Sequence, residues 1–128
     1  MARFIKLPGE RPLFWIGSAK SDLLDCPEAV KDEIGVGLSV AQFGGKNPSA
    51  KPWKGEGPGV LEIVEDSRGD TYRAYYTVKF ERAVYVLHSF QKKSPKGIKT
   101  AQSDVDLVSR RLKAATEDYK ARYGEREK

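Results

Sequence analysis

The stretch VLEIVEDSRGDTYRAYYTVKFERAVYVLHSFQK, residues 60–92, decides the fold of this chain. It holds three runs rich in β-branched and aromatic residues, a composition typical of strands. The runs cover residues 60–65, 72–78 and 83–91. The first connection is built of turn-forming residues and the second is short, so we predict an antiparallel meander.

Two helices and one more strand are predicted around the meander. Leu13–Ile16 is short and apolar, as a buried strand is, and residues 21–24 fit one helical turn. A helix should follow the capping signal at Asp25–Glu28, and a second one should run from Thr100 to Gly124. Apolar residues recur at helical spacing in both: Val30, Ile34, Leu38 and Ala41 in the first, and Ala101, Val105, Val108, Leu112, Ala115 and Tyr119 in the second.

The order of these elements predicts one α+β domain over residues 1–128. A small antiparallel sheet, made of the N-terminal strand and the meander, should pack with the two main helices. The chain is 128 residues long and 39% hydrophobic, which suits a single core. Residues 45–59 are rich in Gly and Pro and are expected to form a long loop.

Composition excludes several functional classes. The only cysteine is Cys26 and the only histidine is His88, so neither an internal disulfide nor a transition-metal site is expected. No phosphate-binding glycine motif and no G-x-S-x-G motif occurs, and we predict no cofactor. No apolar run is long enough to cross a bilayer, so we expect a cytoplasmic protein with no membrane partner.

The positive charge is concentrated in one segment. The chain carries a net charge of +5, and residues 79–99 hold six lysines and arginines against Glu81 alone. A focused basic segment attracts polyanions such as RNA, or an acidic protein partner. A solvated basic loop is the alternative.

Two strands of the meander carry residues suited to nucleic-acid binding. Alternation in the last strand predicts that His88, Phe90 and Lys92 continue the face of Val84 and Val86. A ring for a base beside a cation for a phosphate is typical of nucleic-acid sites, and an ordinary strand end is the alternative.

An arginine in the middle of the sheet also needs an anion. Arg73 either opens on a groove that holds a phosphate or pairs with Glu62 of the preceding strand, and both readings stay open. In the long loop, Lys51 and Lys54 flank Trp53 and form a basic, aromatic clip for RNA. Trp53 as a simple hydrophobic anchor is the alternative.

Taken in order, these segments resemble a known family. Pro52-Trp53-Lys54, Val60-Leu61-Glu62-Ile63, Tyr72-Arg73-Ala74-Tyr75-Tyr76 and the run from Val86 to Ser94 precede a capped helix. Over residues 12–122 the succession resembles the phage-related, HigB-type branch of the RelE/ParE toxin superfamily. Leucine-histidine-x-phenylalanine-x-lysine-lysine at 87–93 is its most specific piece.

The resemblance implies a RelE-like fold and the toxin half of a bacterial type II toxin–antitoxin pair. Many such toxins cut messenger RNA on the ribosome without metal, and in the reaction expected here the RNA 2′-hydroxyl attacks the adjacent phosphate. A cognate antitoxin, often of helix-turn-helix type and encoded adjacently, would bind the toxin, and only this complex would bind operator DNA. The rivals are a ParE-like toxin that poisons gyrase and a non-catalytic binding module.

The resemblance also implies roles for single residues. Arg73 would stabilise the transition-state phosphate, and Lys92 and Lys93 would form the basic run beside it. Glu62 or a lysine of lowered pKa would take the 2′-hydroxyl proton, and His88 would be either structural or catalytic. The expected RNA-binding residues are Lys51, Trp53, Lys54, Tyr75, Phe90, Lys96 and Lys99.

Overall fold

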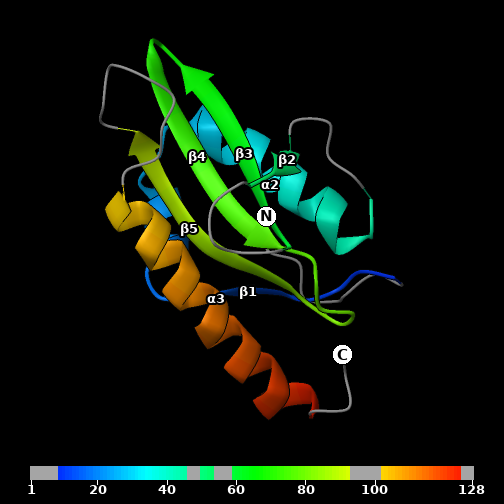
Figure 1. Cartoon of the computed structure of the whole chain (residues 1–128). Coiled ribbons are helices and arrows are strands. Elements are labelled where there is room, and N and C mark those ends of the chain that lie inside the picture. The colour runs from blue at the N-terminus through cyan, green and yellow to red at the C-terminus, as the bar shows by residue number, and fades with distance from the viewer. Residues whose placement is uncertain (1–8, 46–49, 54–58, 93–101, 125–128) are drawn as a thin grey trace.

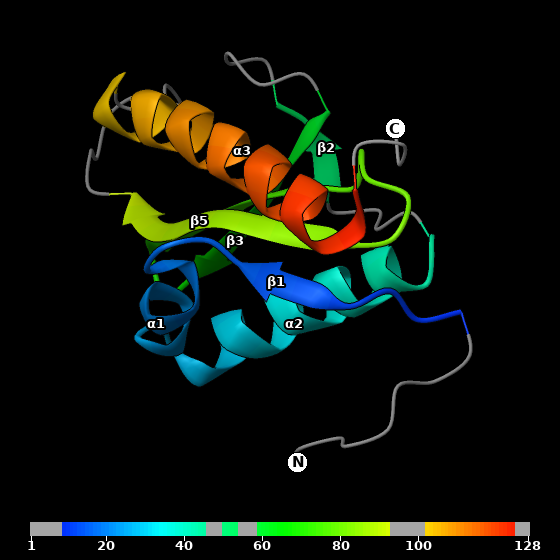
Figure 2. The same cartoon turned by 90° about the horizontal axis from the view of Figure 1, so that it is seen from below.

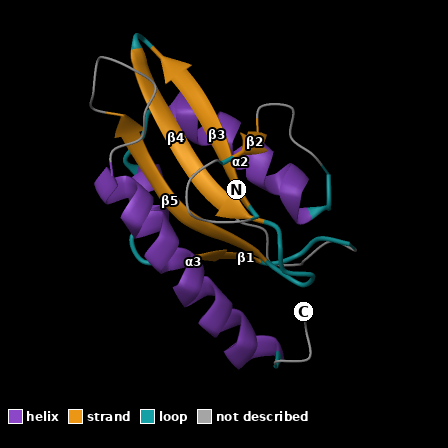
Figure 3. Ribbon diagram, viewed as in Figure 1, coloured by secondary structure: helices purple, strands orange, loops and turns teal. Residues whose placement is uncertain are grey.

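A computed structural model describes residues 9–45, 50–53, 59–92 and 102–124 (Figure 1). Five strands and three helices follow one another in these ranges (Figure 3). In chain order they are β1 (Leu13–Trp15), α1 (Ala19–Leu24), α2 (Glu28–Gln42), β2 (Ala50–Pro52), β3 (Val60–Ser67), β4 (Asp70–Thr77), β5 (Val84–Lys92) and α3 (Gln102–Tyr123). The protein is an α+β domain with one sheet packed against helices, as expected of a RelE-like fold.

The sheet is mixed, with the strand order β1-β5-β4-β3-β2. The predicted meander is confirmed, since β3, β4 and β5 pair antiparallel. The expectation of a wholly antiparallel sheet is wrong, because β1 runs parallel to β5, with Leu13 opposite Val84. Parallel neighbours need a crossover, and here the chain between β1 and β5 supplies it.

Part of the expected loop is a strand. Residues 50–52 form β2 and pair with β3, Ala50 lying opposite Ile63. β2 is the last strand in the sheet order, and an edge is where a sheet tolerates Pro52, which has no N–H to donate. The Gly- and Pro-rich composition therefore excludes a central strand but not an edge strand.

Helices cover both faces of the sheet. Figure 2 shows α1 and α2 on one side and α3 on the other. The four apolar positions predicted on α2 are buried against one face, and Val108, Leu112, Ala115 and Tyr119 of α3 against the other. Val105 is only partly buried, and Ala101 lies outside the described residues. Alternate residues of β4 and β5 thus face two different cores.

The helix ends differ in detail from the sequence prediction. Asp25 is not the N-cap of α2, because Pro27 occupies that position and contributes no side-chain hydrogen bond. α1 is longer than one turn and begins at Ala19. The prediction that Gly124 ends α3 is confirmed: its φ is 85°, and its N–H donates to the Lys120 carbonyl at 2.8 Å. Thr100 lies outside the described residues.

A β-bulge changes which face the second half of β5 presents. His88 lies opposite Tyr75, but Val86 lies opposite Tyr76, so Leu87 is an extra residue. Val86 packs on the α1–α2 side, whereas Leu87 packs on the α3 side. The prediction that His88 and Phe90 continue the face of Val86 is therefore wrong, because one inserted residue reverses the alternation.

Candidate functional site

A cluster of buried polar side chains lies on the α3 side of the sheet. Glu62, Tyr75 and His88 occupy one row across β3, β4 and β5, and Arg73 and Phe90 pair in the next row toward the strand end. Glu62, Arg73 and His88 are all buried, although their side chains are polar or charged. The register thus brings together five residues that the sequence analysis selected from three separate strands.

Glu62 is the acceptor at the centre of the cluster. Its Oε2 forms an ion pair with Nη1 of Arg73 and accepts a hydrogen bond from the Tyr75 hydroxyl at 2.9 Å. Burial alone would lower the pKa of Arg73, but the hydrogen bond and charge of Glu62 outweigh it and raise that pKa. Of the two alternatives for Arg73, a free groove-facing side chain or a pair with Glu62, the structure shows the ion pair. Both donors meet the same carboxylate oxygen of Glu62.

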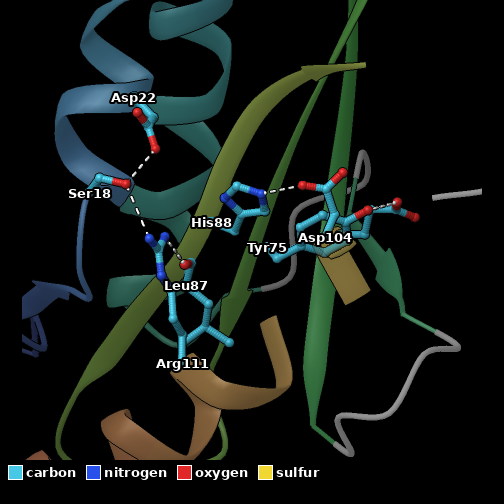
Figure 4. Close-up of polar contacts among 8 residues, drawn as sticks. Ser18, Asp22, Tyr75, Leu87, His88, Asp104 and Arg111 are labelled. Carbon is cyan, nitrogen blue, oxygen red and sulfur yellow. Dashed lines mark hydrogen bonds and ion pairs between the residues drawn. The ribbon is translucent and has the colours of Figure 1, made fainter. Parts of the chain in front are cut away.

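His88 is held by a helix that the sequence analysis did not connect to it. Its Nε2 lies 2.8 Å from Oδ1 of Asp104 in the first turn of α3 (Figure 4). The ring stacks on Phe90, with centroids 4.7 Å apart, and Tyr75 lies beyond it at 6.5 Å. Asp104 carries no sequence signal for this role, because acidic residues are common in first helical turns for other reasons.

The other ring nitrogen of His88, Nδ1, has no hydrogen-bond partner in the part of the chain that the structure describes. Among the described residues, Nδ1 of His88 and Oγ of Ser89 are buried side-chain atoms without a hydrogen-bond partner. Such atoms are uncommon in native proteins, since a buried polar group left unsatisfied costs about 1–3 kcal/mol. These two atoms therefore call for an explanation beyond packing.

A second side chain of α3 holds the bulge. Arg111 donates from Nη1 to the Leu87 carbonyl at 3.0 Å and from Nη2 to Oγ of Ser18 at 3.1 Å (Figure 4). The Ser18 hydroxyl in turn donates to Asp22 at 2.7 Å. Burial lowers the pKa of Arg111, and the charge of Asp22 opposes that shift. The guanidinium thus joins α3, the bulged residue of β5 and the start of α1.

The Arg111 side chain packs against Gly17, where a larger residue would not fit. A Cβ at Gly17 would lie 2.9 Å from the guanidinium carbon, and the φ of Gly17 is 59°. Glycine accepts this left-handed backbone without strain and leaves room for the arginine. The residue therefore fits both the turn and the contact.

The far half of α3 is anchored separately. The Tyr85 hydroxyl donates to Oδ2 of Asp118 at 2.6 Å, and the Tyr119 hydroxyl accepts from the N–H of Arg82 at 3.1 Å. Arg122 also donates to Asp118, at 2.7 Å. These contacts hold the C-terminal half of α3 against the sheet, and α3 also carries Asp104 and Arg111.

Aromatic side chains border the polar cluster. Trp53 lies against Tyr75 with ring centroids 5.3 Å apart, and Phe90 lies 6.0 Å from the same ring. Trp53 and Phe90 are partly exposed, whereas Tyr75 is fully buried. Two of the three predicted aromatic contacts can thus meet a ligand directly, and Tyr75 supports both.

The basic residues of the prediction are only partly placed. Lys51 is exposed on β2, next to Trp53. The backbone of Lys92 pairs with Thr71 at the end of β5. The remaining predicted contacts lie outside the described residues: Lys54, Lys93, Lys96 and Lys99.

In the described ranges, no three His, Cys, Asp or Glu side chains gather in a way that would hold a metal ion. No helix in those ranges is both long and apolar enough to span a membrane.

Comparison with known proteins identifies the family. The family model described as Phage derived protein Gp49-like (DUF891) matches residues 21–113, which include every strand from β2 to β5 and the residues His88, Asp104 and Arg111. A search of curated proteins gave no match. Because the matched residues make up more than half of the chain, the protein belongs to the Gp49-like family of phage-derived proteins, a family of RelE/HigB-like toxin type.

Proposed function

We propose that the protein is the toxin of a type II toxin–antitoxin pair, of the HigB-type branch, and that it cleaves messenger RNA on the ribosome. The family supports a toxin. One observation supports the nuclease assignment. Glu62, Tyr75 and His88 form a row across the sheet, and the partly exposed rings of Trp53 and Phe90 contact this row. Charged groups and a titratable ring next to aromatic stackers suit RNA chemistry.

The reaction proposed is attack of the RNA 2′-hydroxyl on the adjacent phosphate, without a metal ion. Arg73 supplies positive charge for the phosphate in the transition state. Because its guanidinium is paired with Glu62, a phosphate must share it with that carboxylate. Glu62 is therefore assigned the positioning of Arg73 and Tyr75 instead of proton transfer. Lys92 and Lys93 are assigned additional positive charge for the RNA backbone.

The proposed partners follow from the same assignment. A cognate antitoxin encoded adjacently, of helix-turn-helix type, would silence the toxin in the cytoplasm. An acidic, apolar segment of that protein would cover the basic and aromatic surface. Operator DNA would be bound by the complex and not by the toxin alone.

One observation favours a second function. Glu62, Arg73 and His88 are each more than nine-tenths buried, which suits a structural polar cluster as well as a catalytic one. A non-catalytic binding module of the same fold is thus the alternative.

Expression in bacteria followed by mapping of mRNA ends tests the proposal. Growth arrest with cuts in translated messages is expected for wild type. Phe90→Ala should reduce cutting by at least tenfold, and Phe43→Ala is the matched control, because Phe43 is an exposed aromatic residue at the end of α2, on the other side of the sheet. Arrest without cuts would exclude the nuclease, and inhibition of purified gyrase would then identify the ParE-like alternative.

A further inference from the structure

The hydrogen bond to Asp104 determines which nitrogen of His88 carries the proton. An ionised carboxylate can only accept a hydrogen bond, so the 2.8 Å contact requires a proton on Nε2 of a neutral ring. Nδ1 then holds a lone pair. Within the described residues no donor reaches it, and the atom is buried. In a neutral His88 ring, Nδ1 is therefore an acceptor that no donor among the described residues reaches.

The bulge at Leu87 is what brings this ring to the polar cluster. Without the extra residue, His88 would point to the α1–α2 side of the sheet, like Val86. Arg111 holds the bulge through the Leu87 carbonyl, and Asp104 holds the ring. The two residues are seven positions apart, which is two helical turns, so one face of α3 fixes both the backbone and the ring.

Nδ1 of His88 lies in a cluster with Arg73 and the rings of Tyr75 and Phe90. A ligand that donates a hydroxyl hydrogen bond would satisfy this acceptor. The RNA 2′-hydroxyl is such a donor, and its proton must leave when O2′ attacks phosphorus. Oε2 of Glu62 is already engaged by Arg73 and Tyr75. Among the described side chains of the cluster, Nδ1 of His88 is the better acceptor.

We propose that Asp104 is a positioning residue that holds His88 in the Nε2–H form, so that Nδ1 accepts the 2′-hydroxyl proton during RNA cleavage. The inference rests on the proposed nuclease function. O2′ bonds to phosphorus as its proton passes to Nδ1, the P–O5′ bond breaks, and O5′ takes a proton from solvent. The positive charge on the imidazolium is then balanced by Asp104, and the ring later releases its proton to solvent.

Access to Nδ1 requires a side chain to move. Phe90 covers one face of the ring and is partly exposed, so displacement of this phenyl ring by a base is part of the proposal. The charged and titratable groups around His88 are Asp104 and Arg111 from α3, Tyr75 from β4, and Glu62 and Arg73 through Tyr75. Of these described groups, only Asp104 contacts a ring nitrogen of His88 directly.

Nuclear magnetic resonance of the free protein tests the positioning role without any activity. His88 is the only histidine, so a tag-free, nitrogen-15-labelled sample gives one pair of ring nitrogen signals. We expect Nε2 to carry the proton at neutral pH, and Asp104→Ala to mix the two tautomers. Asp106→Ala is the matched control, since Asp106 is also acidic, is exposed and contacts Gln102 instead. A proton on Nδ1 in wild type, or an unchanged spectrum in Asp104→Ala, would overturn the proposal.

Cleavage of ribosome-bound RNA tests the consequence. Asp104→Ala and Asp104→Asn should each lower the single-turnover rate by about 10²-fold or more and displace the pH profile, while Asp106→Ala keeps both. The Asn variant keeps the shape of the side chain if the Ala variant fails to fold. Full activity in either variant would refute the role of Asp104. A wild-type protein that cleaves no RNA would instead refute the proposed function, and the tautomer measurement would still decide the positioning.

Discussion

The ion pair between Glu62 and Arg73 allows a quantitative test of whether this pair is structural, catalytic or both. Both side chains are less than one-tenth exposed. Removing one partner of a buried pair leaves the other charge uncompensated and typically costs about 3–5 kcal/mol. For a chain of 128 residues this corresponds to a fall in Tm of roughly 12–20 °C. Glu62→Leu and Arg73→Met should therefore both be strongly destabilised.

Replacing the whole network should recover most of that loss. Buried pairs exchanged for apolar residues of similar volume are often neutral in stability. Tyr75→Phe belongs in the combination, because its hydroxyl would otherwise lose the Glu62 acceptor, which costs about 1–3 kcal/mol. Urea unfolding followed by circular dichroism would give the free energies for the single and triple variants.

The surface pair of Glu28 and Lys31 is the control. Glu28 is 80% exposed in this contact, so Glu28→Ala should change the free energy of unfolding by no more than about 1 kcal/mol. Single Glu62 and Arg73 variants with losses that small would refute the reasoning from burial. A triple variant that is stable yet fully toxic would show that Arg73 has no part in cleavage.

Three further outcomes are expected. Lys92→Ala combined with Lys93→Ala should flatten the salt dependence of RNA affinity, by up to about one unit of slope per lost phosphate contact; identical slopes across a potassium chloride series would remove both lysines from the interface. Burial and a hydrogen bond to Asp118 raise the pKa of Tyr85, so the native state keeps the phenolic proton to higher pH than the unfolded state, and the free energy of unfolding falls as pH rises above about 10. Urea titrations at about pH 8 and about pH 11 should show a smaller fall for Tyr85→Phe, and an equal fall would assign the effect to other groups. Gly17→Ala should cost about 1–3 kcal/mol, because of its positive φ and the adjacent guanidinium; an unchanged urea midpoint would contradict this.

The local patterns predicted the elements well. Helical spacing identified the buried face of α2, and turn-forming residues at 66–70 identified the hairpin between β3 and β4. These features depend on residues close in sequence. The Glu62 partner suggested for Arg73 is also the one that the structure forms.

Apart from the helix ends, the failures involve contacts between distant segments. The parallel pairing of β1 has no local signature, because a short apolar run fits either direction. The bulge at Leu87 contains no glycine to signal it and is held by Arg111, which lies on another element. Asp104 resembles an ordinary first-turn acidic residue until the fold places it next to His88.

The pairing of β1 with β5 has a consequence for synthesis on the ribosome. β1 is the first strand to emerge, yet Leu13 finds its partner only when Val84 has been made. Until then β1 has no neighbour in the sheet, since the strand order gives it β5 alone. The contacts of Asp104 and Arg111 with β5 form later still, because both residues follow β5 in the chain. The cluster of Glu62, Arg73, Tyr75 and His88 is therefore complete only once α3 can dock, because distant pairings form late in folding.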